Sequence, residues 1–372
     1  MKIAMVLNFY FPYGGLQRDF ARIARKAIER GHEVVALVED WQGPALEGVE
    51  IRRLAMPSLS NHARIRRFSR AIADIRETAE FDCILGFNRL AGLHVYFAAD
   101  SCFAARLRGG RRILALLPRY ATYLRLERNI AAQDGPLILF LNDDQLQQYQ
   151  QHYSLSPERY RVLPPGIETD RRRPPDHATL RQGIRHQLGL DEQNKLLLFL
   201  GSGFRIKGLD RALKAFAVQD SHVHLMIAGN DDAKAYMEGL PAELIQRIHL
   251  LGARDDVPAL MQAADLLLHP AYRESAGMVL LEATVAGLPV LVTDTCGYSG
   301  FIQEAGSGVV LASPFKQEQL DRTLRSMLDS VPGTWQQCGL EYAENPELYR
   351  LPEVVVEHLE HAIEGRDGER GE

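Results

Sequence analysis

The sequence predicts an α/β protein built from two Rossmann-like domains in tandem. Short apolar runs alternate with amphipathic helical patterns from end to end, which is typical of parallel sheets covered by helices. Runs such as residues 196–200 are apolar throughout, as expected of strands buried on both faces. The 372 residues also exceed what one hydrophobic core usually supports, so two domains are expected.

The apolar runs give the expected positions of the strands. In the first half they lie at Ile3–Leu7, Val34–Val38, Cys83–Gly86, Val95–Ala98, Leu137–Leu141 and Tyr160–Leu163. In the second half they lie at Lys195–Leu200, His222–Ala228, Ile248–Leu251, Leu266–His269, Pro289–Val292 and Gly308–Leu311.

Clustered prolines and charges between Pro164 and Pro175 indicate an irregular connection between the domains. We therefore expect an N-terminal domain at residues 1–168 and a C-terminal domain at 169–345. A helix at 346–364 is expected to pack back on the first domain. The glycine-rich, charged residues 365–372 are expected to form a flexible tail.

Composition excludes several functional classes. A net charge of -5 and a pI near 6.2 argue against a nucleic-acid partner. The four cysteines are scattered, which predicts buried thiols and neither a disulfide framework nor a zinc site. No apolar run approaches the ~20 residues needed to cross a bilayer, and residues 3–8 are too short and polar for a signal peptide. We expect a soluble, cytoplasmic protein that can still attach peripherally to a membrane.

Two glutamates near a predicted helix start are candidate ligand-binding residues. The loop after residues 266–269 leads into a helix, whose first amide groups can hold a phosphate. The residues around this start are Ala276, Gly277, Met278 and Val279. Glu282 lies inside the helix and suits the two hydroxyls of a ribose, while Glu274 precedes it and can reach the sugar. The alternative is that Glu282 is simply a solvated helix residue.

The loop at residues 201–208 supplies two cations between a strand and a helix. It matches neither a Walker A motif nor a GxGxxG motif, because Leu209 and Asp210 replace the Walker A residues and Ile206 replaces the last glycine. Arg205 and Lys207 suit a diphosphate whose charge grows as it leaves. The alternative is two ordinary surface cations.

The glutamate pair with the Gly-Leu-Pro-Val of residues 287–290 resembles the donor-site motif of retaining GT-B glycosyltransferases. The chain is also similar over most of its length to bacterial lipopolysaccharide core glycosyltransferases, which add a hexose to an inner-core heptose. That likeness includes the segments at 14–15, 99–102, 164–167 and 201–205. It implies two Rossmann-like domains facing each other across a cleft, with residues 1–168 binding the acceptor and residues 169–345 binding the nucleotide sugar. It also implies a UDP-sugar donor and retention of anomeric configuration. It also implies that the backbone at Ala253 and Arg254 brackets the nucleobase.

Four residues of the first domain are further candidates. Gly14 and Gly15 let the backbone approach a ligand closely, and the resemblance implies that their loop faces the donor phosphates. The resemblance also implies that Asp19 faces the acceptor. The competing interpretation is a carboxylate at a helix N-terminus, stabilised by the helix dipole. Asp100 ends a strand at the edge where α/β proteins bind ligands, and many relatives have histidine there. It is expected to orient an acceptor hydroxyl or stabilise positive charge at the anomeric carbon.

No metal and no cofactor are expected. The Asn-Asp-Asp triplets at residues 142–144 and 230–232 are interpreted as helix caps. His222 and His224 lack an evident third ligand, so a solvated strand edge is favoured.

The segment from Cys102 to Arg128 contains seven arginines and one acid, Glu127. Apolar residues recur in it at helical spacing, which favours an interfacial helix on an anionic membrane; the alternative is a surface helix packed on the core. The candidate membrane-binding residues are Arg106, Arg108, Arg111, Arg112, Arg119 and Arg125.

The sequence thus favours a retaining, metal-independent hexosyltransferase at the cytoplasmic face of the inner membrane. The expected donor is UDP-glucose by resemblance, with UDP-N-acetylgalactosamine second because Ala98 and Ala99 are small. The expected acceptor is a heptose of the lipopolysaccharide inner core. A nucleotide-sugar epimerase or sugar phosphorylase on the same fold, and a non-catalytic membrane-attached scaffold, are the alternatives.

Overall fold

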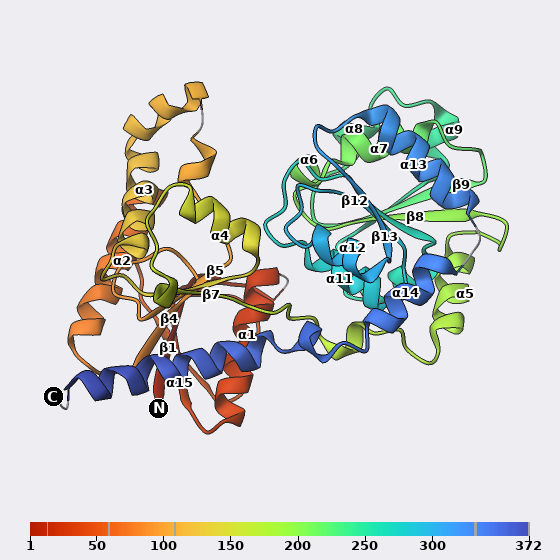
Figure 1. The fold of residues 1–372 in the computed structure, drawn as a ribbon. Coiled ribbons are helices and arrows are strands. Elements are labelled where there is room, and N and C mark those ends of the chain that lie inside the picture. The colour runs from red at the N-terminus through yellow and green to blue at the C-terminus, as the bar shows by residue number, and fades with distance from the viewer. Residues whose placement is uncertain (13, 59, 108, 331–332, 371–372) are drawn as a thin grey trace. The chain divides into compact units, whose positions relative to one another are not determined.

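A computed structural model describes residues 1–12, 14–58, 60–107, 109–330 and 333–370, and gives the backbone alone for 109–112 and 364–370. The chain divides into two compact units. Unit 1 comprises Met1–Gly166 with Tyr349–Glu372, and unit 2 comprises Ile167–Leu348. The division at Gly166 lies within the proline-rich connection. Each unit contains one parallel sheet with helices packed against it (Figure 1).

The sheet of unit 1 has the strand order β3-β2-β1-β4-β5-β6-β7, and its described pairs are all parallel. Its strands are β1 (Lys2–Tyr10), β2 (Glu33–Trp41), β3 (Val49–Arg53), β4 (Cys83–Gly86), β5 (Val95–Ala98), β6 (Leu137–Phe140) and β7 (Tyr160–Val162). Its helices are α1 (Gly15–Glu29), α2 (Asn61–Glu77), η1 (Ala104–Arg106), η2 (Gly109–Leu116), α3 (Pro118–Ala131), α4 (Asp143–Gln150), η3 (Pro157–Arg159) and α15 (Leu351–Arg370). Apolar side chains of α2, α3 and α4 form one core with the inner strands.

The C-terminal helix α15 belongs to unit 1, where it crosses α1 and packs against it (Figure 1). Glu360 accepts hydrogen bonds from Arg30 at 3.0 Å and pairs with His32 at 2.8 Å. Lys26 adds an ion pair with Glu353 at 3.4 Å. The expected helix bounds, 346–364, are wrong at both ends. The chain first forms η5 (Pro346–Tyr349), and α15 continues through the glycines to Arg370, beyond the expected start of the tail.

The sheet of unit 2 is also parallel, with the order β10-β9-β8-β11-β12-β13. Its strands are β8 (Lys195–Leu200), β9 (Val223–Ala228), β10 (Ile248–Gly252), β11 (Leu266–His269), β12 (Val290–Thr293) and β13 (Gly308–Leu311). Its helices are η4 (Thr169–Arg171), α5 (His177–Gln187), α6 (Phe204–Lys207), α7 (Leu209–Ala217), α8 (Lys234–Met237), α9 (Ala242–Ile245), α10 (Val257–Ala263), α11 (Met278–Val285), α12 (Ser299–Ala305), α13 (Gln317–Asp329) and α14 (Thr334–Tyr342).

The prediction of two Rossmann-like domains is confirmed, and each predicted strand has a counterpart among the observed strands. The sequence missed β3, the edge strand next to β2. Its sequence, VEIRR, is only partly buried and carries three charged residues in five positions. It therefore lacks the continuous apolar run that marks a strand buried on both faces.

Candidate active site

The carboxyl ends of β8, β11 and β12 bring together most of the predicted donor-binding residues of unit 2. Two glycines let the chain turn tightly after β8. Gly201 has φ of 126°, and a Cβ there would lie 2.7 Å from Cε of Lys207. Gly208 has φ of 78°, and a Cβ there would collide with the carbonyl oxygen of Pro270. Glycine at both positions therefore allows the loop to pass close to the end of β11.

Lys207 and Glu274 form an ion pair at this edge of the sheet. The Lys207 ammonium donates to Oε2 of the Glu274 carboxylate, and both side chains are largely but not fully buried. The two residues are far apart in sequence, and the sequence predicted them separately. Partial burial strengthens a charge interaction, yet a remaining opening lets an anionic ligand compete for the lysine.

The loop that carries Glu274 is held by the segment after β12. The Glu274 amide donates to the Thr295 carbonyl at 3.1 Å, and its carbonyl accepts from the Gly297 amide at 3.2 Å. The hydroxyls of Thr293 and Thr295 both donate to the Ala271 carbonyl, at 2.8 and 2.7 Å. These bonds give the Glu274 carboxylate a defined position. Burial, with Glu274 nearby, raises the pKa of the adjacent Cys296 thiol to about 12, so this cysteine is not a nucleophile at neutral pH.

The helix α11 begins at Met278, and Gly277 before it has φ of 90°. This start was predicted at Ala276, Gly277, Met278 and Val279, and the first amides of a helix have no acceptor within it. Glu282 lies in the following turn and is only 7% exposed. The alternative of a solvated helix residue is therefore wrong for Glu282.

The other predicted donor residues lie at the surface of unit 2. Arg205 is exposed on the short helix α6, two residues before Lys207. Ala253 and Arg254 are exposed after β10, where the Arg254 guanidinium donates to the Asp256 carboxylate at 2.7 Å. The nucleobase role of this segment stays a prediction.

His269 is a residue of this site that the sequence analysis missed. It ends β11 and is fully buried, with its Nε2 3.9 Å from Oε2 of Glu274. Burial, and then the charge of Lys207, lower its pKa to about 3, so the imidazole is neutral at physiological pH. A polar residue at the end of an apolar strand was the available signal.

In unit 1, Gly14 and Gly15 form the start of α1. A Cβ on Gly14 would collide with the Gln17 side chain, whose amide donates to the Phe9 carbonyl at 3.0 Å. Asp19 lies one turn into the helix, not at its N-terminus, and pairs with Arg22 at 3.7 Å. The competing interpretation as an N-terminal carboxylate is therefore wrong, while the acceptor role stays a prediction.

Asp100 follows β5, as expected, and its side chain is 59% exposed. Arg89 holds its loop: the guanidinium lies 3.4 Å from the Asp100 carboxylate and donates to the Ser101 carbonyl at 2.6 Å. Arg89 in turn pairs with the fully buried Glu127 at 3.1 Å. From the sequence, Glu127 was recognised only as the one acid in the basic segment, and its burial was not predicted.

Glu127 lies on α3 and also holds the residues that follow Asp100. Its carboxylate accepts from the Ala104 amide at 2.8 Å and from the Tyr153 hydroxyl at 3.0 Å. The Cys102 thiol lies 3.5 Å from it. Burial, with Glu127 nearby, raises the pKa of Cys102 to about 12. The buried pair of Arg89 and Glu127 therefore positions the Asp100 loop.

The triplets at residues 142–144 and 230–232, interpreted as helix caps, accept hydrogen bonds from backbone amides at helix starts. The Asn142 side chain accepts from the Gln145 amide at 2.9 Å, which confirms it as the cap of α4. In the second triplet, Asp232 accepts from the Lys234 amide at 2.8 Å at the start of α8, and Asp231 accepts from the Phe204 amide at 2.8 Å at the start of α6. His224 lies 3.2 Å from His249 on β10, and burial and His249 lower its pKa to about 4. Among the described residues, no group of three or more candidate ligands is placed to hold a metal ion.

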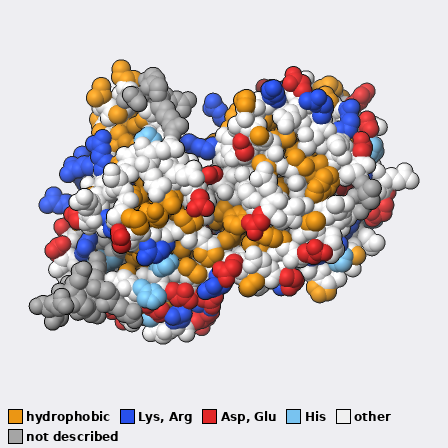
Figure 2. Space-filling view, viewed as in Figure 1, with side chains coloured by type: hydrophobic (Ala, Val, Ile, Leu, Met, Phe, Trp, Pro, Cys, Tyr) orange, Lys and Arg blue, Asp and Glu red, His pale blue; other side chains and the backbone are white. Residues whose placement is uncertain are grey.

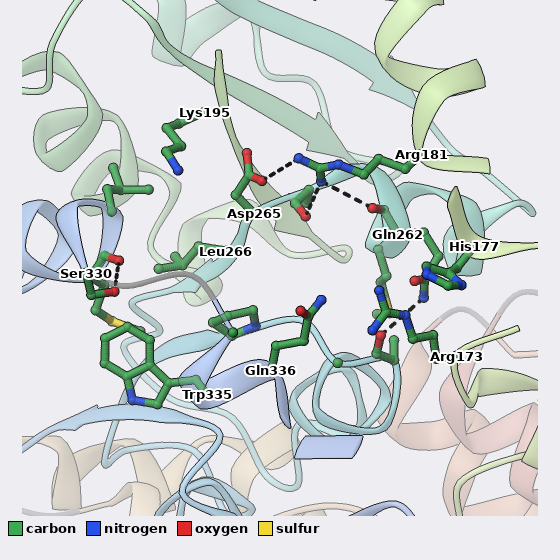
Figure 3. Close-up of a pocket in the computed structure, with 18 residues that line it drawn as sticks. Arg173, His177, Arg181, Lys195, Gln262, Asp265, Leu266, Ser330, Trp335 and Gln336 are labelled. Carbon is green, nitrogen blue, oxygen red and sulfur yellow. Dashed lines mark hydrogen bonds and ion pairs between the residues drawn. The ribbon is translucent and has the colours of Figure 1, made fainter. Parts of the chain in front are cut away.

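A cavity of about 340 Å³ in unit 2 lies at the opposite edge of the sheet, near the amino ends of β8 and β11 (Figure 3). Arg181 projects there and pairs with Asp265 at 2.8 Å, while Asp265 also accepts from the Leu196 amide at 2.7 Å. Arg181 further donates to the Ala263 carbonyl at 3.0 Å. The charges of Arg181 and Asp265 hold α5 and α10 against β8, at the edge of the sheet opposite to the predicted donor-binding residues.

The basic segment has two different parts. From Thr122 onward, the inner side of α3 is buried in unit 1, as the packed-helix interpretation expects. Before it, Ile113 is 70% and Leu116 82% exposed, and Figure 2 shows hydrophobic side chains at this end of unit 1. No described helix is long and apolar enough to cross a bilayer.

The predicted membrane-binding arginines differ in what the structure says of them. Arg119 and Arg125 are exposed on α3. Arg106 is partly buried and donates to the Ser101 hydroxyl at 3.0 Å, so it is turned toward the Asp100 loop. Arg108 lies outside the described residues, as do the side chains of Arg111 and Arg112.

Comparison with known proteins covers both units. Residues 13–171 match the Glycosyltransferase Family 4 model, and residues 181–336 match the Glycosyl transferases group 1 model. The chain is 40% identical over 375 residues to the lipopolysaccharide glucosyltransferase WaaG of Escherichia coli K12, covering 98% of this chain and all of that one. It is 31% identical over 197 residues to a D-inositol 3-phosphate glycosyltransferase of Corynebacterium aurimucosum, covering 49% of this chain and 46% of that one.

Solved structures show the same relationship. A crystal structure of WaaG, described as a glycosyltransferase involved in lipopolysaccharide biosynthesis, matches with a TM-score of 0.87 and 38% identity over 96% of this chain and 99% of that one. Anabaena Alr3699/HepE, solved with UDP and glucose, matches with a TM-score of 0.76 and 19% identity over 97% of this chain and all of that one, a likeness of fold alone. The chain has the GT-B fold and belongs to the WaaG-like lipopolysaccharide glycosyltransferases.

Proposed function

We propose that the enzyme transfers a hexose from a UDP-sugar, UDP-glucose first, onto a heptose of the lipopolysaccharide inner core with retention of configuration. The observation that carries the proposal is the Lys207–Glu274 pair beside the start of α11. A cation and helix amides suit a diphosphate, and a nearby carboxylate suits sugar hydroxyls. The relative with 40% identity is a lipopolysaccharide glucosyltransferase, which supports both the acceptor class and glucose.

The mechanism we propose is a front-face substitution. The leaving phosphate oxygen accepts the proton of the acceptor hydroxyl while the new glycosidic bond forms on the face that the diphosphate leaves. Lys207 and Arg205 stabilise the charge that grows on the diphosphate, as preorganised cations do in a partly buried site. Asp100 stabilises positive charge at the anomeric carbon or orients the acceptor. No enzyme nucleophile is needed.

A donor screen tests this proposal. Purified enzyme is supplied with UDP-Glc, UDP-Gal, UDP-GlcNAc or UDP-GalNAc and a deacylated core oligosaccharide, and UDP release is measured with and without acceptor. Acceptor-dependent release with UDP-Glc is expected, and a preference for UDP-GalNAc would replace glucose as the donor. Isomerised donor without transfer would favour an epimerase.

Turnover is expected to survive EDTA, because Lys207, Arg205 and the start of α11 supply the positive charge that neutralises the diphosphate. Loss of turnover that Mg²⁺ or Mn²⁺ restores would contradict metal independence.

Glu282→Ala is expected to weaken UDP binding by about 2–4 kcal/mol, because buried ribose hydroxyls would lose a charged partner. Titration calorimetry with UDP measures the change. Glu243→Ala, at an exposed glutamate of α9, is the control and should bind UDP as the unaltered enzyme does. Unchanged affinity in Glu282→Ala would remove this residue from the ribose site.

We further propose that the exposed end of unit 1 around Ile113 and Leu116 docks on the anionic cytoplasmic face of the inner membrane. Its side chains are apolar, and Arg119 and Arg125 are exposed on the helix that follows. An acceptor anchored by acyl chains would then lie at the surface that holds the enzyme. Each arginine near an anionic surface adds about 1 kcal/mol, which gives reversible binding.

Ile113→Ser with Leu116→Ser is expected to release the enzyme from vesicles of phosphatidylglycerol and phosphatidylethanolamine. Burying each side chain contributes roughly 1.5–3 kcal/mol, and serine removes that contribution. Cosedimentation measures binding, and Leu250→Ser, at an exposed leucine of β10 in unit 2, is the control. Turnover on a soluble acceptor should not change. An enzyme that ignores these vesicles at low salt, where screening is weakest, would overturn the membrane proposal.

A further inference from the structure

The buried His269 lacks hydrogen bonds that its environment should supply. Both ring nitrogens are shielded from solvent, and neither has a hydrogen-bond partner among the described residues. The low pKa of the ring means that it is neutral, so one nitrogen bears a proton and the other a lone pair. Buried polar groups without partners are rare because they destabilise the folded state. We therefore expect the His269 imidazole to gain a hydrogen-bond partner when the enzyme binds its ligand.

The nearest charged partner of His269 is Glu274, and Lys207 occupies it. The 3.9 Å between Nε2 of His269 and Oε2 of Glu274 is too long for a hydrogen bond. The same carboxylate oxygen accepts from the Lys207 ammonium. A shift of about 1 Å by the carboxylate would bring it within hydrogen-bond distance of the imidazole. Oε2 of Glu274 therefore has two possible hydrogen-bond donors, the Lys207 ammonium and the His269 imidazole.

Binding of the donor changes which partner is available. Under the proposed function, on which this inference rests, Lys207 turns to the diphosphate. The Glu274 carboxylate, which is largely buried, would then lose its cation, and a buried charge without a partner is unfavourable. We propose that His269 is the second partner of Glu274: its Nε2–H donates to the carboxylate when Lys207 moves to the donor diphosphate. His269 is thus a positioning residue that acts through Glu274.

A neutral imidazole suits this role better than a second cation. It orients the carboxylate through one hydrogen bond and leaves its negative charge available to the sugar. Full burial among packed residues at the end of β11 also keeps the ring in one place, so only the carboxylate has to move. The Nε2–H group has no acceptor in the free enzyme, and in the donor complex it gains the Glu274 carboxylate.

Exchange of partners predicts that His269 and Lys207 are coupled in nucleotide binding. His269→Leu removes the Nε2–H hydrogen-bond donor and is expected to weaken UDP binding about tenfold when Lys207 is present. With Lys207→Met, His269 can serve Glu274 with and without UDP. The same His269→Leu change should then alter the UDP affinity less than about threefold. Calorimetry on the four proteins of this double-mutant cycle measures the coupling.

Two polar variants locate the nitrogen that matters and do not depend on the leucine variant folding. The Gln amide nitrogen can take the place of Nε2, whereas the Asn amide nitrogen lies near Nδ1. His269→Gln is expected to retain UDP affinity and kcat within about threefold, because the glutamine amide keeps a hydrogen-bond donor at the position of Nε2. His269→Asn has no donor at that position and is expected to lose about tenfold in both. The melting temperature of His269→Leu should be equal to or above that of the unaltered enzyme, since an unsatisfied polar group is removed.

A spectroscopic measurement observes the new bond directly. In enzyme labelled with ¹⁵N-histidine, UDP should shift the Nε2–H proton of His269 downfield, and His269→Gln identifies that resonance. Equal losses on His269→Leu in both Lys207 backgrounds, or equal behaviour of His269→Gln and His269→Asn, would overturn the inference. An enzyme that binds UDP and transfers sugar with such a result retains the proposed function. An unaltered enzyme that binds no UDP would contradict the proposed function itself.

Discussion

Lys207→Ala is expected to lower kcat by about 10²–10³-fold, because a preorganised charge at a growing anion contributes this much to many transition states. KM for the UDP-sugar should change less, since the charge on the diphosphate is greatest as it leaves. Initial rates with UDP-Glc and a deacylated core acceptor give both constants. Arg205→Ala should have the same sign and a smaller effect, because Arg205 is exposed and Lys207 is largely buried.

The control for Lys207 is Lys214→Ala, at an exposed lysine of α7 in the same unit. It changes the net charge equally and should leave both constants unchanged. A rise in KM without a fall in kcat would assign Lys207 to ground-state binding of the donor. No change in either constant would exclude it from the reaction.

Glu127→Ala is expected to lower the free energy of unfolding of unit 1 by about 3–5 kcal/mol, the usual result of breaking a buried ion pair on one side. Arg89 would remain buried without its acid, and the Ala104 amide and the Tyr153 hydroxyl would lose their acceptor. The chain has two tryptophans, Trp41 in unit 1 and Trp335 in unit 2. In a Trp335→Phe background, urea unfolding followed by the fluorescence of Trp41 therefore reports on unit 1.

Two variants test the stated cause of this destabilisation. Glu47→Ala, at an exposed glutamate of unit 1, should leave the unfolding of unit 1 within about 0.5 kcal/mol. Arg89→Met combined with Glu127→Leu removes both buried charges and should recover part of the loss. A Glu127→Ala protein as stable as the unaltered one would mean that the pair does not hold the Asp100 loop.

The strands and the start of α11 could be predicted because their causes are local. Parallel strands buried on both faces need continuous apolar residues, and β8 and β11 have them. A strand–loop–helix sequence with glycine at Gly277 places the helix start beside the strand end. β3 could not be found this way, because an exposed edge strand needs little apolar sequence. The C-terminal helix was misplaced at both ends. The sequence pattern does not separate η5 from α15, and the glycines and charges of residues 365–370 are typical of a tail although the backbone there is helical.

The sequence by itself identified the chemistry of Lys207 and Glu274, because an ammonium and a carboxylate bring their charge wherever they lie. Only the tertiary structure decided that they meet, that His269 lies buried beside them, and that Glu127 is a buried acid in an otherwise basic segment. Burial and pairing depend on residues far apart in the chain. They also change what a side chain does: the same imidazole that would be charged in part when exposed is held neutral inside unit 2.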